Sequence, residues 1–202
     1  MQVSTAAKER VFDRAERLFN ARGYTAVSMR DIADSLAMRQ ASLYYHVPEG
    51  KEQLYVEVAM RNLHRHEAGI GEVIASTEAK SVEVRLRALA EWFLDNAPLR
   101  LLSTLETDMA ALSTEHAQFL TKLAYQALFA PIAALFAEAQ ERGEIRAMNP
   151  AQLAGYFLSL MDGNSYSSTS GLVDTAMDVL VGDAVDVLLN GLREINTENG
   201  KF

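Results

Sequence analysis

The sequence contains no cysteine among its 202 residues. Disulfides, thiolate metal ligands and cysteine nucleophiles are therefore excluded. The sequence also shows no signal peptide and no apolar run of 18 residues, so we expect a soluble, cytoplasmic protein that does not cross a membrane. A chain of this length can bury a substantial core in one or two domains.

Catalytic and cofactor-binding motifs are missing as well. Two helical positions that are two residues apart do not face together, so we interpret His64–Glu67 as a solvated face and not as a metal site. There is no zinc-protease pattern and no G-x-S-x-G, and Gly69-Ile-Gly71 lacks the third glycine of a nucleotide loop. Asp162-Gly-Asn164 lacks the glycine and the terminal Glu of a calcium loop. We predict no enzyme, no metal and no cofactor.

The net charge of −8 is distributed unevenly along the chain. Residues 1–66 contain ten Lys and Arg against eight Asp and Glu, a net charge of +2, whereas residues 67–202 contain nine against nineteen, a net charge of −10. A positive N-terminal part on an acidic body suits a protein that approaches a polyanion with its N-terminal part first. An acidic body is also ordinary for a cytosolic protein, so charge alone does not decide the function.

Residues 28–36 have the clearest local pattern. Ser28 can cap the start of a helix, and Asp31 stands at the spacing of a capping box. The apolar residues that follow recur at helical spacing: Met29, Ile32, Ala33 and Leu36. This pattern predicts a short amphipathic helix with one packed face.

A turn at residues 37–39 leads to a second predicted helix, about 39–46. This helix is too short to be stable alone, so we expect Leu43 and Val47 to hold it by packing. Its other side carries hydrogen-bonding side chains suited to base edges and phosphates: Arg39, Gln40, Ser42, Tyr44 and His46. Two short helices joined by a tight turn predict a helix-turn-helix unit, which places its second helix in the DNA major groove. A helical pattern over residues 5–22, closed by Gly23, completes a three-helix unit.

Three motifs occur in order over about residues 8–60: F-x-x-R-G-Y-T-A-V-S-M-R-D-I-A-D-S-L, A-S-L-Y-Y-H-V and P-E-G-K-E-Q-L. They resemble the N-terminal domain of the TetR (tetracycline-repressor-like) family of transcriptional regulators. The resemblance implies an all-α fold with a helix-turn-helix DNA-binding domain, residues 1–50, and a helical ligand-binding and dimerisation domain, residues 51–202. It also implies a homodimer on double-stranded operator DNA, usually a repressor, that a small molecule releases.

The resemblance further implies roles for single residues. It places Arg39, Gln40, Ser42, Tyr44 and His46 on the groove side of the second helix, Ser28 and Arg30 on the backbone or an outer base, and Lys51 on a phosphate. The chain departs from the family where Ala37 replaces a usual glycine, Val47 replaces a usual Phe and the link before Lys51 is one residue longer. Arg39 replaces a small hydroxyl residue, and it can either read a guanine or sit on a phosphate.

The rest of the chain predicts further helices at about 51–75, 81–96, 115–142, 150–161 and 174–195. Pro131 should kink or break the helix in which it lies. Asn149-Pro150 is a strong helix start, since it combines a cap with a proline in the first turn. Residues 162–171 are polar and are expected to form a mobile stretch.

Apolar stripes on the last two helices predict the dimer interface, as a four-helix bundle with two-fold symmetry. The stripes are Leu153, Tyr156, Phe157 and Leu160, then Val179, Val181, Val185, Leu188, Leu189 and Leu192. Gly155 would allow the close approach of a second backbone. The alternative is that both stripes complete the core of one subunit.

The sequence indicates less clearly which residues would bind a small apolar effector. The candidates are Trp92, Phe93, Leu105, Met109, His116, Phe119, Tyr125 and Met161, with Leu101, Leu123, Phe129 and Asn164 as further ones. Aromatic and Met residues at helical spacing equally fit an ordinary core, and His116 equally fits a capping or surface role beside Ser113.

Three functions remain open from the sequence. The first is a ligand-released dimeric repressor, and the second is a DNA-binding regulator without a small-molecule input, which a collapsed cavity would favour. The third is a helical adaptor or protein-binding module that no longer binds DNA, for which Ala37 and the longer link are the support.

Overall fold

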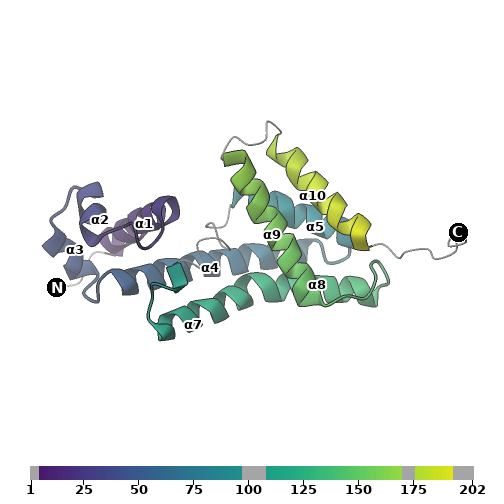
Figure 1. The fold of residues 1–202 in the computed structure, drawn as a ribbon, viewed down its shortest axis with the longest axis horizontal. Coiled ribbons are helices and arrows are strands. Elements are labelled where there is room, and N and C mark those ends of the chain that lie inside the picture. Colours follow the sequence, from purple (N-terminus) through teal and green to yellow (C-terminus); the bar gives the residue numbers. More distant parts are fainter. Residues whose placement is uncertain (1–4, 97–107, 170–175, 193–202) are drawn as a thin grey trace, which may run out of the picture. The chain divides into compact units, whose positions relative to one another are not determined.

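The structure is a computed structural model that describes residues 5–96, 108–169 and 176–192, without the side chains of residues 5, 164–169 and 177. Every regular element in these segments is a helix, which confirms the predicted all-α fold (Figure 1). The helices are α1 (Thr5–Arg22), α2 (Met29–Ser35), α3 (Gln40–His46), α4 (Lys51–Ser76), α5 (Val82–Asp95), α7 (Thr114–Ala124), the π-helical segment η1 (Tyr125–Phe129), α8 (Ala130–Glu141), α9 (Pro150–Thr169) and α10 (Met177–Leu192).

The chain forms two compact units. The first contains residues 1–65 and 99–124, and the second contains residues 66–98 and 125–202. Two of the three crossings between the units fall within helical stretches. One lies between Arg65 and His66 in α4, and the other between Ala124 and Tyr125, where α7 meets η1. This grouping by compactness is distinct from the functional division expected at residue 50, which remains a prediction.

The first unit has one apolar core between α1, α2, α3 and the start of α4. The core contains Val11, Phe12, Ala15, Phe19, Tyr24, Val27, Met29, Ile32, Ala33, Leu43, Val47, Leu54 and Val58. Leu43 and Val47 are 0% and 3% exposed, as the pattern predicted. Helix α3 has seven residues, so this packing is what holds it in place.

Local signals at the helix ends act as expected. Ser28 and Asp31 form the complete capping box of α2. Gly23 follows α1 with a φ of 77°. Ala37, in the turn between α2 and α3, also has a left-handed φ, 54°. This conformation costs an alanine about 1 kcal/mol, whereas a glycine adopts it without that strain.

The second unit is built mainly from α5, α8, α9 and α10. Helix α8 packs on α9, and α10 packs on both α5 and α9 (Figure 1). The side chains at these contacts are almost fully buried: Leu86, Leu89, Phe93, Ile132, Leu135, Phe136, Leu153, Phe157, Val181 and Val185. The apolar stripes predicted on the last two helices therefore supply part of this core.

Residues 114–141 run as one long helix that contains η1. Pro131 lies in the first turn of α8, directly after the π-helical segment. A proline offers no N–H to the carbonyl four residues earlier and crowds it, and a π turn relieves this by widening the helix. The predicted disturbance is thus a local widening within a continuing helix.

The same long helix is apolar enough, by length and composition, to span a membrane. The sequence still has no unbroken apolar run of 18 residues, as expected, because Lys122, Gln126 and Pro131 interrupt this stretch. One such helix is weak evidence for a membrane span, because core helices pass the same test. Leu128, Ile132 and Phe136 of this helix are buried in the second unit.

Helix α9 is longer than predicted. It begins as expected, where the Asn149 side-chain oxygen accepts the backbone N–H groups of Ala151 and Gln152 at 3.0 and 3.3 Å. It continues to Thr169, so the expected end near Met161 and the mobile stretch over 162–169 were wrong. Ser, Thr and Asn lower helix stability by only a few tenths of a kcal/mol each, and this segment contains no proline to stop the helix. Residues 170–171 of the expected stretch lie outside the described residues.

The ring of Trp92 lies directly on the backbone of α4 in the second unit. A Cβ atom added to Gly69 would be 2.3 Å from Cζ2 of the indole. The His66 ring meets the indole edge-on, with ring centroids 5.4 Å apart, and is 5% exposed. The expected solvated face is therefore wrong at His66, because α4 turns this side chain inward while His64 and Glu67 stay exposed. Among the described residues, no group of three His, Asp or Glu side chains could hold a metal.

We expect Gly69→Ala to destabilise the protein by about 1–3 kcal/mol, the usual range for overpacking a core. The added methyl group would overlap rigid ring atoms of Trp92, and the indole would have to move. Gly71→Ala is the matched control, because an added Cβ there has nothing within 4 Å and alanine favours a helix. Urea unfolding followed by circular dichroism separates the two substitutions, and equal effects would contradict this packing.

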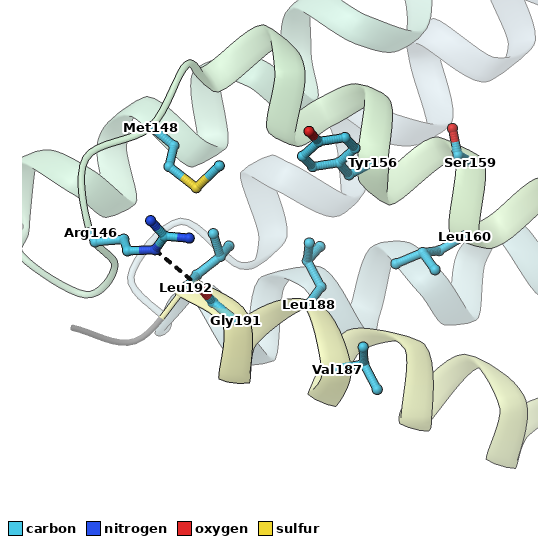
Figure 2. Close-up of a pocket in the computed structure, with 9 residues that line it drawn as sticks. All are labelled: Arg146, Met148, Tyr156, Ser159, Leu160, Val187, Leu188, Gly191 and Leu192. Atoms are coloured by element: carbon cyan, nitrogen blue, oxygen red, sulfur yellow. Dashed lines mark hydrogen bonds between the residues drawn. The ribbon is translucent and has the colours of Figure 1, made fainter. Parts of the chain in front are cut away.

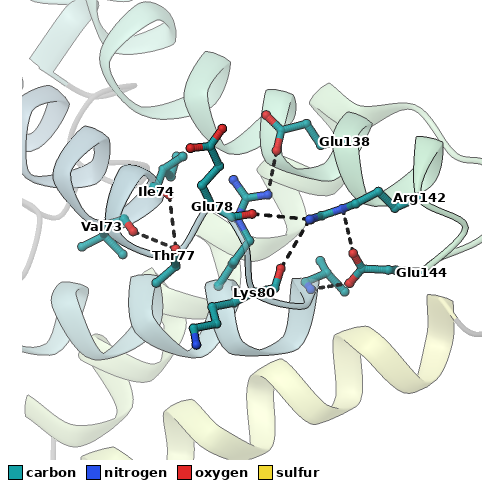
Figure 3. A network of polar contacts seen from close by, with 10 residues as sticks. Val73, Ile74, Thr77, Glu78, Lys80, Glu138, Arg142 and Glu144 are labelled. Atoms are coloured by element: carbon teal, nitrogen blue, oxygen red, sulfur yellow. Dashed lines mark hydrogen bonds and ion pairs between the residues drawn. The ribbon is translucent and has the colours of Figure 1, made fainter.

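A buried arginine crosses from α5 to α8. The Arg85 side chain is 1% exposed, and its Nη1 donates to Oε2 of Glu138 at 2.7 Å. Its Nε and Nη2 are buried without a hydrogen-bond partner among the residues that the structure describes. Close by, Arg142 donates to the carbonyl groups of Glu78 and Lys80 at 3.5 and 3.4 Å (Figure 3). These contacts join the end of α8 to the connection between α4 and α5.

Candidate nucleic-acid interface

The outward side of α3 carries the polar residues that the sequence predicted. Arg39, Gln40, Ser42 and Tyr44 are exposed, Tyr44 to 42%. They are exposed because Leu43 and Val47, on the opposite side, are buried in the core. Within the described part of the chain, no hydrogen bond or ion pair engages these four side chains. Their donors and acceptors are therefore available to a partner.

His46 is half-buried and differs from the other α3 candidates. Its Nδ1 is buried and has no hydrogen-bond partner within the described part of the chain, so only part of the ring faces solvent. Its ring centroid lies 5.7 Å from that of Tyr45, edge-on. Tyr45 is 51% exposed and was not among the predicted residues. The adjacent Tyr44-Tyr45 pair was visible in the sequence and could have suggested it.

Ser28 and Arg30 lie at the start of α2. Ser28 is exposed and has its hydroxyl 2.5 Å from Oδ2 of Asp31, while its backbone N–H donates to the same oxygen at 2.8 Å. These hydrogen bonds from Ser28 lower the pKa of Asp31. The Arg30 side chain is 81% exposed and has one loose ion pair, 3.6 Å to Asp34. Arg30 is thus free to reach toward a phosphate.

Lys51 already has partners within the first unit. Its Nζ donates to the carbonyl of Tyr24 at 2.9 Å and lies 4.0 Å from the centroid of the Tyr24 ring. Burial lowers the pKa of Lys51, and the charge of Asp108 opposes that change. The geometry gives Lys51 a structural role at the connection between α1 and α2. Its contact with a phosphate stays a prediction.

A buried carboxylate lies beneath the same connection. Asp108 is 2% exposed, and both of its oxygens lie 3.0 Å from the backbone N–H of Tyr24. The Tyr55 hydroxyl donates to Oδ2 at 3.2 Å. Burial, and then the charge of Asp108, raises the pKa of Tyr55 well above its usual value. Sequence analysis missed this contact, because Asp108 and Tyr24 are 84 residues apart and no local pattern connects them.

A second carboxylate contact lies at the start of α4. Glu52 accepts the backbone N–H of Ser113 at 2.8 Å and lies 2.7 Å from Nδ1 of His116. The hydrogen bonds from Ser113, followed by that of His116, lower the pKa of Glu52 to about 2. His116, a candidate ligand residue, is therefore a partner of Glu52 in the first turn of α7.

The candidate ligand residues belong to different units. Met109, His116 and Phe119 are in the first unit, and Trp92, Phe93, Tyr125 and Met161 are in the second, while Leu105 lies outside the described residues. Phe93 and Met161 are buried, whereas Phe119 and Tyr125 are 43% and 50% exposed. Neither of the two described cavities is lined by any of them. The ligand site remains a prediction.

An apolar groove of about 450 Å³ lies between α9 and α10, which we call the α9–α10 groove (Figure 2). It is lined by Arg146, Met148, Tyr156, Ser159, Leu160, Val187, Leu188, Gly191 and Leu192. Tyr156 and Val187 are 46% and 69% exposed, whereas Phe157 and Val185 are fully buried. The apolar stripes predicted for the dimer interface, on α9 and α10, thus have one side buried in the core of the unit and one side exposed to solvent.

Gly155 does not face this groove. A Cβ added to Gly155 would lie 3.9 Å from the Phe129 ring of η1, in the same unit. The prediction that Gly155 allows the close approach of a second backbone stays a prediction.

Comparison with known proteins identifies the N-terminal helices. Residues 11–58 match the family described as bacterial regulatory proteins, tetR family. The HTH-type transcriptional regulator LmrA of Bacillus subtilis is 39% identical over 51 residues, which are 25% of this chain and 27% of LmrA. The biofilm operon negative transcriptional regulator IcaR of Staphylococcus epidermidis is 40% identical over 48 residues, 24% of this chain and 25% of IcaR. The matches thus span about a quarter of these curated relatives.

Solved structures share the fold along nearly the whole chain. A tetR-family regulatory protein from Rhodococcus RHA1 has a TM-score of 0.77 and 20% identity, covering 96% of this chain and 100% of its own. A putative transcriptional regulator from Saccharomonospora viridis, in complex with choline, has a TM-score of 0.72 and 24% identity, covering 95% and 100%. At such identities the likeness shows the fold. The family match thus identifies residues 11–58 as similar to the DNA-binding part of tetR-family regulators, and the solved structures extend the shared fold along the rest of the chain.

Proposed function

We propose that the protein is a dimeric transcriptional repressor that binds palindromic operator DNA and is released by a small molecule. The observation that carries this proposal is the open polar side of α3, opposite the buried Leu43 and Val47. A helix presented in this way can enter the major groove with its side chains free to meet base edges. Repression is supported by IcaR, a negative regulator that is 40% identical to this chain over 48 residues.

In this proposal the exposed residues of α3 read bases. Arg39, Gln40 and Tyr44 are free to contact base edges, with Ser42 and His46 beside them. An arginine binds guanine through two hydrogen bonds, so Arg39 would favour a guanine at its position. Ser28 and Arg30 would contact the phosphate backbone, and Lys51 would join them only by leaving the Tyr24 carbonyl.

A small effector of the C-terminal part completes the proposal. The regulator from Saccharomonospora viridis, of the same fold, holds choline. Residues 51–202 would form the regulatory and dimerisation part, and the candidate effector residues would be those named from the sequence. The protein would act in the cytoplasm, without a cofactor and without catalysing a reaction.

The α9–α10 groove is the proposed dimer interface. Its open apolar side would be covered by the same side of a second subunit, as two-fold symmetry requires. We expect Val187→Glu to yield monomers, because each interface would bury two new charges without partners. The matched control is Val84→Glu, at a valine on α5 that is 46% exposed. Sedimentation velocity measures the result, and a dimer that survives Val187→Glu would place the interface elsewhere.

Selection from a random pool of duplex DNA, at near-physiological salt, tests the proposed function directly. Enrichment of a palindrome is the expected result, since a dimer places two copies of α3 on two half-sites. Failure of the folded, ligand-free protein to enrich any sequence would overturn the proposal and favour the adaptor function.

A further inference from the structure

Both backbone groups of Tyr24 are held by residues outside the helix-turn-helix connection. Its N–H donates to Asp108, in the segment that leads into α7, and its carbonyl accepts from Lys51, the first residue of α4. Tyr24 begins the connection from α1 to α2, so its position affects where the helix-turn-helix lies. One residue thus links the helix-turn-helix to the two helices that continue into the second unit.

The segment 108–113 is anchored to the first unit at several points. Asp108 accepts from Tyr24 and Tyr55, and the Ser113 N–H donates to Glu52. Leu112, between them, packs against the apolar core of the helix-turn-helix. We call these contacts the link clamp. Any displacement of the first turn of α7 must either carry the link clamp along or break it.

Asp108 is the residue in the link clamp that tolerates displacement least. Its carboxylate is 2% exposed, and its hydrogen-bond donors are the Tyr24 N–H and the Tyr55 hydroxyl. A buried carboxylate that loses its donors, and a buried N–H that loses its acceptor, are both strongly unfavourable. Moving Tyr24 together with Asp108 therefore costs less free energy than separating the two residues.

We propose that Asp108 is a positioning residue that couples α7 to the recognition helix α3 through the backbone of Tyr24. This inference rests on the proposed function and names how its DNA-binding site is regulated. Helix α7 continues through η1 into α8 of the second unit, so a change there reaches Tyr24 by a route separate from α4. Because coupling is reciprocal, DNA bound at α3 must also affect the segment 108–116.

Hydrogen exchange measured by mass spectrometry, with and without the selected operator duplex, tests the inference without knowledge of the effector. In the unaltered protein, DNA should protect α3 and also slow exchange over 108–116 roughly tenfold, within the usual range of coupling between sites. In Asp108→Asn, which loses the charge and one of the two acceptor oxygens, DNA should protect α3 and slow exchange over 108–116 less than in the unaltered protein. Glu115→Gln, at an exposed carboxylate in the first turn of α7, is the matched control and should behave as the unaltered protein.

Two results would overturn the inference alone. One is protection of α3 in the unaltered protein with no change over 108–116, and the other is an unaltered response in Asp108→Asn. Absence of protection at α3 in the unaltered protein would overturn the proposed function and this inference with it. If Asp108→Asn does not fold, Tyr55→Phe replaces it, since it removes one donor to Asp108 and should reduce the response over 108–116.

Discussion

Replacing Tyr44 and His46 together by alanine is expected to abolish sequence-specific DNA binding while the protein stays folded. Each side-chain contact with a base contributes about 1–3 kcal/mol to discrimination. Loss of two contacts in each subunit should weaken operator binding by about 3 kcal/mol or more, which is at least roughly a hundredfold. Tyr44 is 42% exposed and His46 is half-buried, so the unfolding free energy should fall by no more than about 1 kcal/mol.

Fluorescence anisotropy with a labelled operator duplex measures this loss, beside a duplex of random sequence. Arg30→Ala is the control, because a phosphate contact supports all sequences alike. It should weaken binding to the operator and to random DNA to the same extent. It should also reduce the slope of log affinity against log salt concentration by about one. Unchanged operator affinity in a folded double variant would mean that α3 does not read the DNA.

Removing Glu138 is expected to destabilise the second unit strongly. In Glu138→Leu the buried guanidinium of Arg85 loses its partner, while the leucine keeps water from replacing the carboxylate. Removing one member of a buried pair typically costs about 3–5 kcal/mol. Since half of the Glu138 side chain is exposed, we expect the lower end, about 3 kcal/mol.

Arg85→Met should behave differently. It removes the buried charge together with Nε and Nη2, which have no hydrogen-bond partner in the described segments. Exchange of a buried ion pair for apolar side chains is often neutral or stabilising. The double variant Arg85→Met, Glu138→Leu should therefore recover most of the stability lost in Glu138→Leu. Urea unfolding of the four proteins gives the coupling energy, and a Glu138→Leu protein as stable as the unaltered one would show that Arg85 does not depend on this carboxylate.

Features whose cause is local were predictable from the sequence. Ser28 with Asp31, Gly23, and Asn149 before Pro150 each define a helix end through contacts within a few residues. The packed face of α3 followed from Leu43 and Val47 in the same way. The helix-turn-helix is defined almost entirely by such local patterns, so its helices could be predicted from the sequence.

Contacts between distant residues were not predictable. Asp108 reaches Tyr24 across 84 residues, and Arg85 reaches Glu138 across 53. A single sequence contains no pattern that pairs such positions, so the link clamp and the buried arginine were missed. His66 was misjudged for a related reason, because the partner that buries it, Trp92, lies on another helix. The end of α9 was placed too early because polar residues were taken as a loop, although none of them stops a helix.

Trp92 is the only tryptophan of the chain. Its indole rests on α4 at Gly69, within the second unit. Tryptophan fluorescence therefore reports on the second unit. The indole that emits it lies against α4, and the first residue of α4, Lys51, contacts Tyr24 in the helix-turn-helix unit. Candidate effectors can be screened by their effect on this emission in the unlabelled protein, and the same signal can be followed in time after mixing.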